Sequence, residues 1–224
     1  MLLLLLAAVL WVAWHVGLSG TRLRDAVVAL LGANAFRITF SLGSVATIVF
    51  LVFAYRGASG TQLWTLAAWL QWLLVAAMIP ASMLFVGSVA TRNPTAVGAN
   101  AGSLEPARGV IRITRHPMLW AFGIWAGVHL IANGDTASLL FFGAFLVTIV
   151  AGIPSLDAKL ARRNPARWQP LAAATSMIPG AAIAQGRNRV VVSELWLPIV
   201  GGAALWLILL FGHPHVIGVA PWPT

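Results

Sequence analysis

The stretch ITRHPMLWAFGIWAGVHLIANGD, from Ile113 to Asp135, decides the fold. At about 1.5 Å per residue, its apolar part is long enough to span a hydrocarbon core about 30 Å thick. It ends in Asn-Gly-Asp, a turn signature. Near its start, Pro117 suits a first helical turn, where the missing N–H would have no partner. The stretch therefore predicts a membrane-spanning helix that begins near His116.

The composition of the whole chain also indicates a membrane protein. It is 60% hydrophobic and only 8% charged, whereas soluble domains carry about 25% charged residues. There is no cysteine, which excludes disulfides and thiolate metal sites. The net charge of +9 does not indicate a nucleic-acid partner, because the arginines lie in loops between apolar segments. We expect a lipid bilayer to surround the chain.

Six apolar segments predict an all-α, polytopic transmembrane helical bundle, with one membrane domain over residues 1–224. The predicted spans are residues 1–19, 35–55, 64–90, 115–133, 136–154 and 194–212. Pro80 predicts a kink or a break in the third. After span five, the apolar segment 168–184 is interrupted by prolines and a glycine, so we expect it to be interfacial or re-entrant. The first span lacks a basic start and an Ala-x-Ala site, and we expect a retained helix.

Basic residues set the predicted orientation. Loops 20–34, 91–114 (with Arg115 at its edge) and 155–193 hold 2, 4 and 6 of them, which is 12 of the 14 in the chain. The positive-inside rule places these loops in the cytoplasm and both termini outside. Segment 155–167 predicts either an interfacial helix at anionic lipid or a solvated connector. Asp25 and Asp157, beside arginines, are expected to pair with them at the surface.

Histidines inside predicted spans are candidate functional residues. His15 lies in span one and His129 in span four, while His116 opens span four. His116 and His129 are 129 − 116 = 13 residues apart, which on a helix is about 19.5 Å and 220°, so they cannot share one metal ion. A partner for His129 must come from another helix. His15 is the natural candidate, since imidazole is a common haem ligand.

Several alternatives stay open at this point. A histidine within a span is also explained by a hydrogen bond to a neighbouring helix. The predicted spans put His15 about 10 Å and His129 about 20 Å from the cytoplasmic edge, so His213 is a rival partner for His129. Arg115 and His116 suit either a structural helix start or a contact to a ligand headgroup at the cytoplasmic mouth.

Other motifs carry less. His213-Pro-His215 is read as an outer turn, and Trp14 and Trp125 could line a flat aromatic cofactor. The chain has no nucleophile elbow, phosphate-binding loop or zinc-protease motif, which argues against common hydrolysis and phosphoryl transfer.

The stretch TRHPMLWAFGIWAGVHLIANGD closely resembles the central motif of the NnrU family. The resemblance also covers WHVGLSGTRLR, AFRITFSLGSVATIVFLVFAYR, ARWQPLAAATSMIP and GHPHVIGVAPWP, and so spans nearly the whole chain. NnrU proteins are bacterial membrane proteins linked to denitrification, that is, to nitrite and nitric oxide reduction. The resemblance implies a multi-pass inner-membrane protein that supports nitrogen-oxide metabolism.

The family is similar to plant and cyanobacterial 15-cis-ζ-carotene isomerase, a membrane protein that carries haem b. His15 and His129 match the axial histidines of that enzyme, which implies a haem b with these two ligands. Ala126 stands where the isomerase has a cysteine proposed as an alternative ligand, and Arg56 where it has a histidine. A ligand swap to cysteine is therefore impossible in this chain.

A more distant similarity is to isoprenylcysteine and phospholipid methyltransferases, which share the Arg-His-Pro triplet near S-adenosylmethionine. Those enzymes carry a downstream acidic pair, and this chain offers only Asp157 there, which argues against methyl transfer. The sequence thus leaves three hypotheses: a haem protein of nitrogen-oxide metabolism, a haem-dependent polyene isomerase, and a haem-free assembly partner. The expected ligand is a hydrophobic small molecule or a nitrogen oxide.

Overall fold

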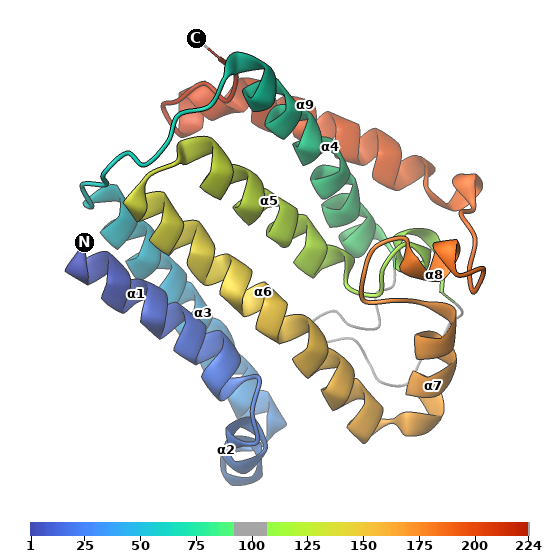
Figure 1. Ribbon diagram of the computed structural model, residues 1–224. Coiled ribbons are helices and arrows are strands. Elements are labelled where there is room, and N and C mark those ends of the chain that lie inside the picture. Colours follow the sequence, from blue (N-terminus) through green and yellow to red (C-terminus); the bar gives the residue numbers. More distant parts are fainter. Residues whose placement is uncertain (92–106, 224) are drawn as a thin grey trace. The chain divides into compact units, whose positions relative to one another are not determined.

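The computed structural model describes residues 1–91 and 107–223, so Arg92 of the second basic loop lies outside it. Its helices (Figure 1) are α1 (Leu2–Val12), α2 (Leu23–Leu31), α3 (Ala33–Arg56), α4 (Ala68–Ala90), α5 (Pro117–Asn133), α6 (Thr136–Arg163), α7 (Pro165–Ala174), α8 (Ala181–Ala184) and α9 (Trp196–Val216). Within the described residues no strand forms, and extended pairing is confined to one isolated bridge between Gln62 and Asp135. The all-α prediction is confirmed.

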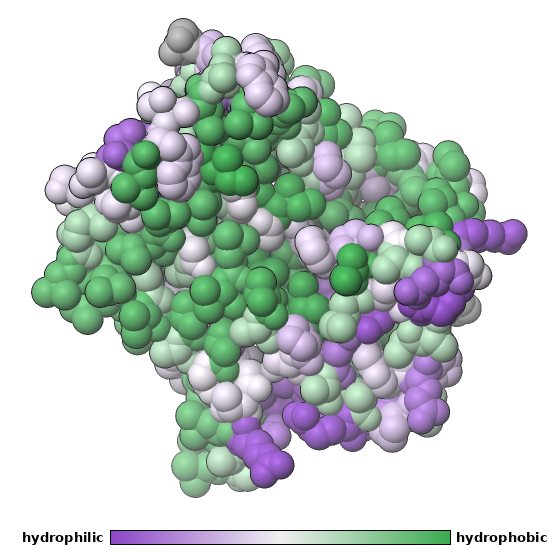
Figure 2. Space-filling view, viewed as in Figure 1, coloured by the Kyte–Doolittle hydropathy of each residue, from purple (hydrophilic) through white to green (hydrophobic). Residues whose placement is uncertain are grey.

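Four of these helices, α3, α4, α6 and α9, are long and apolar enough to cross a membrane. A fifth span is added if Leu2–Leu18 and Leu23–Leu31, bent by 74°, count together. Helix α5 has 17 residues, or about 25 Å. Much of the visible surface is hydrophobic, and hydrophilic side chains gather over α7 and the end of α6 (Figure 2). The chain is a membrane protein, while the number of six spans and the orientation stay predictions.

The described chain forms two compact units. Unit 1 comprises Met1–Thr65 and His129–Ser155, and unit 2 comprises Leu66–Val128 and Leu156–Thr224. In unit 1, α1 packs against α3, and α1 and the first part of α6 run in the same direction (Figure 1). Leu4, Ala7 and Leu51 are fully buried there. The prediction of a single domain is not tested by this division.

The turn that joins α5 to α6 is built as its sequence predicts. Gly134 has a φ of +65°, in the left-handed region that favours glycine. Asp135 then caps α6, because its Oδ1 accepts hydrogen bonds from the N–H groups of Ala137 and Ser138, both at 2.9 Å. A charged cap at the N-terminus of a long apolar helix satisfies donors that lipid cannot.

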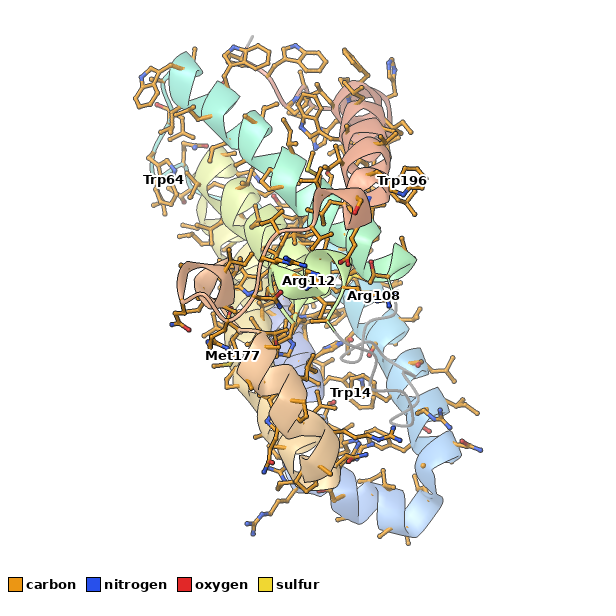
Figure 3. The ribbon with its side chains drawn as sticks, turned by 90° about the vertical axis from the view of Figure 1, so that its right-hand side faces the viewer. Trp14, Trp64, Arg108, Arg112, Met177 and Trp196 are labelled. Atoms are coloured by element: carbon orange, nitrogen blue, oxygen red, sulfur yellow. The ribbon has the colours of Figure 1, made fainter. Side chains whose placement is uncertain are left out.

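Unit 2 is organised around the contact between α4 and α9. A Cβ at Gly202 would lie 2.6 Å from the Met83 Cα, so only glycine permits this approach of the two helices. Leu84 of α4 also forms a buried cluster with Val110 and Ala121. Trp69 at the start of α4 and Trp196 at the start of α9 (Figure 3) are both well exposed. Because α4 and α9 are antiparallel (Figure 1), these tryptophans suit opposite membrane interfaces.

Pro80 does not break α4, contrary to one of the two outcomes expected for it, since the helix continues from Ala68 to Ala90. A proline removes the hydrogen bond to the carbonyl four residues earlier, here Ala76. One residue before that carbonyl, Val75 O accepts a hydrogen bond from Trp206 Nε1 at 3.0 Å.

The basic segment 155–167 is not a separate helix. It forms the last turns of α6, a break at Asn164 and the first turn of α7, which opens on Pro165. Segment 168–184, predicted to be interfacial or re-entrant, contains the rest of α7 and the short α8. His213 and His215 lie in the last turn of α9, where His213 Nδ1 donates to Val219 O at 2.6 Å.

Candidate functional site

His15 lies on an irregular part of unit 1. Helix α1 continues as a π-helix over Ala13–Leu18, a widened geometry that is frequent at functional sites. His15 Nδ1 is 2.9 Å from the carbonyl oxygen of Trp11. Since a carbonyl can only accept, Nδ1 carries the proton, and Nε2 keeps its lone pair. This is the tautomer that binds a metal through Nε2.

Aromatic rings surround this imidazole. The Trp11 ring lies 3.8 Å from the His15 ring and the Phe40 ring 5.5 Å, centroid to centroid. Trp14 (Figure 3) donates its indole N–H to Phe40 O at 3.2 Å. A Cβ at Gly43 would lie 2.0 Å from the Trp14 ring, so a glycine is required there. The packing around His15 is therefore tight.

A run of ring contacts connects His15 with His129 within unit 1. Phe142 lies 5.2 Å from the His129 ring, and the intervening centroid distances range from 3.8 to 5.4 Å. We call the four intervening rings the aromatic array: Trp11, Phe145, Phe141 and Phe142. The two histidines thus share one apolar region, and aromatic side chains rather than a direct contact join them.

The histidines are offset along the helices. Trp11 on α1 is level with Phe145 on α6, so His15 lies about one turn further along. His129 contacts Phe142 on the preceding turn of α6. The offset is about seven residues, or about 10 Å, and it agrees with the difference in depth that the predicted spans give.

His15 and the aromatic array fit a haem in their donor chemistry, whereas the offset of about 10 Å does not bring His129 to the same iron as His15 in this structure. A haem needs neutral imidazole nitrogens and an apolar surrounding, and His15 Nε2 and the aromatic array supply both. The indole Nε1 of Trp11 is buried and has no hydrogen-bond partner, although buried indole N–H groups usually have one. The indole N–H of Trp11 is thus a donor in the array that no protein group accepts from.

Unit 2 contains a second polar cluster, made of Arg115, His116 and Asp157. Arg115 donates to both Asp157 oxygens, with Nη2 to Oδ2 at 2.6 Å and Nε to Oδ1 at 3.0 Å. His116 Nε2 donates to Asp157 Oδ1 at 2.7 Å. The His116 side chain is 0% exposed and its Nδ1 has no partner. A carboxylate between two donors is a satisfied buried ion pair.

The remaining donors of Arg115 bind the end of α7. Its Nη1 donates to Thr175 O at 3.0 Å, and its guanidinium lies 5.1 Å from the Trp168 ring centroid. Arg187 donates to Ala173 O at 2.6 Å and Asn188 to Ala174 O at 2.7 Å. Cations and amides thus satisfy the last carbonyls of α7. The irregular segment after α7 is ordered in this way.

A further ion pair joins Arg112 to Glu194, two residues before α9 begins. Arg112 (Figure 3) donates to Glu194, with Nε to Oε2 at 2.8 Å and Nη2 to Oε1 at 3.0 Å, and Gly109 N–H adds a bond of 2.6 Å to Oε2. The hydrogen bonds from Arg112 lower the pKa of Glu194 to about 2, against desolvation, which raises it. The same hydrogen bonds raise the pKa of Arg112.

The predicted site residues thus fall into two groups. His15 and His129 belong to unit 1, whereas Arg115, His116 and His213 belong to unit 2. Arg115 is committed to Asp157 and Thr175, and its predicted contact with a ligand headgroup stays a prediction. Asp157 pairs with an arginine as predicted, but its side chain is only 12% exposed, so the predicted surface position is wrong.

The structure also bears on the predictions for Asp25 and Trp125, and it shows one residue, Trp11, that the sequence interpretation did not identify. Asp25 pairs with Arg24 on the surface, as predicted. Trp125 lies edge-on to Phe122 in unit 2, and its predicted role at a cofactor stays a prediction. The sequence interpretation missed Trp11, although its place four residues before His15, on the same helix face, was the available signal.

Comparison with known proteins gives the family. The family described as NnrU protein matches residues 3–221. The chain belongs to the NnrU family. This agrees with the resemblance seen in the sequence motifs. No solved structure matches the chain.

Two curated relatives are similar to this NnrU protein over nearly its whole length. Both are described as 15-cis-zeta-carotene isomerase, chloroplastic. The one from Arabidopsis thaliana is 29% identical over 237 residues, covering 98% of this chain and 60% of the relative. The one from Zea mays is 26% identical over 222 residues, covering 94% and 59%. The chain therefore spans about three fifths of the length of these relatives.

Proposed function

We propose that this NnrU protein is a membrane-embedded isomerase of a conjugated polyene lipid, with a haem b ligated by His15 and with His129 as the second ligand that the resemblance implies. The relation to two carotene isomerases supports the reaction class. The observation that carries the proposal is the aromatic array, which joins the two histidines in unit 1 and leaves His15 Nε2 able to bind a metal.

The protein's own residues would have distinct roles. Trp11 O accepts a hydrogen bond from His15 Nδ1–H and so fixes the orientation of the ring. Phe141, Phe142 and Phe145 pack on one another, and this gives the region an apolar character that excludes water and suits a polyene. When bound, the haem would supply a one-electron or Lewis-acid centre at the polyene.

The location and the physiological role are part of this proposal. We place the protein in a bacterial inner membrane with its basic loops in the cytoplasm. A role in denitrification, with nitrite or nitric oxide as the ligand, is the alternative that the NnrU resemblance implies. A haem-free assembly partner of another membrane complex is the third possibility.

The first test is an absorption spectrum of the detergent-purified protein, oxidised and reduced with dithionite. We expect a stoichiometric Soret band, which His15→Ala or His129→Ala abolishes or shifts while the protein stays folded. His215→Ala is the matched control, because this exposed histidine is not part of the aromatic array. A Soret band that neither His15→Ala nor His129→Ala changes would exclude the proposed ligand pair.

Two further arms separate the alternatives. Incubation with a cis polyene, followed by chromatographic separation of its isomers, tests isomerisation directly. Titration with nitric oxide tests the nitrogen-oxide role, through a shift of the same band. If no band forms even after haem is supplied during expression, the haem proposal fails and the assembly role becomes the better explanation.

A further inference from the structure

Among the described residues, two buried side-chain polar atoms have no hydrogen-bond partner, Trp11 Nε1 and His116 Nδ1. An indole nitrogen is always a donor, so Trp11 leaves an N–H unpaired. Leaving a buried donor unpaired costs about 1–3 kcal/mol, and within a membrane span no water compensates. An unpaired donor near the C-terminal end of α1 therefore points to an acceptor that the protein does not supply.

Four other tryptophans pair their indole N–H groups within the protein. Trp14, Trp64, Trp120 and Trp206 each donate to a backbone carbonyl, at 3.2, 2.9, 2.8 and 3.0 Å. Trp11 differs from its neighbour Trp14, only three residues further along the chain. The Trp11 indole N–H thus makes no hydrogen bond within the described part of the protein.

The surroundings of Trp11 define what the missing acceptor belongs to. Its ring lies between those of His15, at 3.8 Å, and Phe145, at 4.9 Å. Its own carbonyl accepts a hydrogen bond from His15 Nδ1–H, so the region offers one unpaired N–H and one unprotonated imidazole nitrogen. The neighbouring contacts are aromatic. This combination suits a largely apolar molecule that carries an oxygen able to accept a hydrogen bond.

We infer that Trp11 Nε1 donates a hydrogen bond to an acceptor oxygen of a molecule bound at the aromatic array. The inference rests on the proposed function for the place of binding. The oxygen has two possible sources. One is a carboxylate of the haem itself, and the other is a keto or hydroxyl oxygen of the polyene. A pure hydrocarbon would leave the N–H unpaired.

The test compares Trp11→Phe with Trp14→Phe. Phenylalanine keeps an aromatic ring and, at position 11, keeps the carbonyl that holds His15. Trp11→Phe removes an unpaired donor, so the ligand-free protein should be as stable as the wild type or more so. Trp14→Phe removes a paired donor and should lower ligand-free stability. Melting in one detergent, without added ligand, measures both.

Binding then identifies the source of the oxygen. If it is the haem carboxylate, Trp11→Phe should weaken haem binding about ten- to a hundredfold, the value of one hydrogen bond to a charged group. If it is the polyene, the wild type should bind canthaxanthin, a diketo carotenoid, more tightly than β-carotene, and Trp11→Phe should remove the preference. Trp206→Phe, which removes a paired indole in unit 2, should change neither quantity. Haem affinity is read by absorption titration and carotenoid affinity by quenching of tryptophan fluorescence.

A spectroscopic measurement on the unmodified chain guards against loss of fold. Ultraviolet resonance Raman reports the hydrogen bonding of indole N–H groups, and the unbonded signal assigned by its loss in Trp11→Phe should shift when ligand binds. If Trp11→Phe destabilises the ligand-free protein as Trp14→Phe does, or if no added ligand shifts the signal, the inference is overturned. A carotenoid preference that depends on Trp11 in protein without any Soret band would support the inference while rejecting the haem.

Discussion

His116 and His15 show two different ways of burying an imidazole. His116 donates to a carboxylate that also binds Arg115, and its side chain is 0% exposed. His15 donates only to the carbonyl one turn before it, and its ring is partly buried among aromatic rings. The first histidine belongs to a network that ties separate segments together. The second belongs to no network, and this leaves its outer nitrogen available to a ligand.

The difference is one of charge as well as of contact. In unit 2 an ion pair links the start of α5, the end of α6 and the residue after α7. In unit 1 the aromatic array contains no charged side chain, and Trp11 even keeps a donor unpaired. Polar groups around Arg115 thus fix the fold in unit 2, whereas those around His15 make few hydrogen bonds within the protein. Substitutions that distinguish stability from binding test this contrast.

The largest expected effect is that of Arg115→Met. It leaves the Asp157 carboxylate with one donor in a site where its side chain is only 12% exposed. Removing one partner of a buried ion pair typically costs about 3–5 kcal/mol of unfolding free energy. Unfolding of the variant in a fixed detergent should show a loss of this order.

The double variant Arg115→Met with Asp157→Leu is the control. Replacing both partners with apolar residues removes the unpaired charge, so it should regain most of the lost stability. If the double variant is as unstable as Arg115→Met alone, the cost comes from lost packing around Trp168 and not from charge. That result would weaken the contrast between the two units.

A smaller loss is expected for His116→Leu. The variant removes the donor to Asp157 but keeps the ion pair with Arg115. Hydrogen bonds to charged groups are worth about 1.5–3 kcal/mol, and we expect the unfolding free energy to fall within that range. His116→Gln, which keeps an N–H donor, should lose less. Equal losses in the two variants would show that the imidazole shape, and not its proton, matters.

How far the sequence predicted these two regions depends on the kind of contact. The apolar runs predicted the helices, because burial in lipid follows directly from composition. They also placed His15 and His129 on separate helices. The sequence could not show Asp157 beside Arg115, because 157 − 115 = 42 residues separate them and the contact depends on how α6 and α7 end.

The aromatic array was also beyond the sequence, for a different reason. Phenylalanines in α6 are equally consistent with lipid contact, and only the packing of α1 on α6 shows that Phe145 meets Trp11. The unpaired indole is an absence, and an absence of partners is visible only when all neighbours are placed. Sequence patterns therefore predicted where the histidines lie, and the structure shows what each one touches.

His15→Leu should cost much less than His116→Leu in ligand-free protein. Its polar contact is a neutral hydrogen bond within its own helix, worth about 1 kcal/mol. We expect a loss of that size or smaller in the melting of haem-free protein. With haem present, the wild type alone should gain stability, because a ligand that binds only the folded state stabilises it. A large loss of stability in haem-free protein would show that His15, like His116, mainly stabilises the fold.

The smallest effect should come from Glu194→Gln, because this ion pair is partly exposed, with side chains 22% and 26% accessible. Such pairs contribute about 1 kcal/mol or less. The pKa of Glu194 is lowered from 4.5 to about 2, chiefly by the hydrogen bonds from Arg112. A carboxyl group with a lowered pKa in the folded state adds stability above pH 4.5 and loses it as the pH falls toward 2. The melting difference between wild type and variant should therefore be constant from pH 7 to 5 and shrink steadily below 4.5. A difference that vanishes already at pH 5, or that is unchanged at pH 2, would show that the Arg112 pair does not hold the approach to α9.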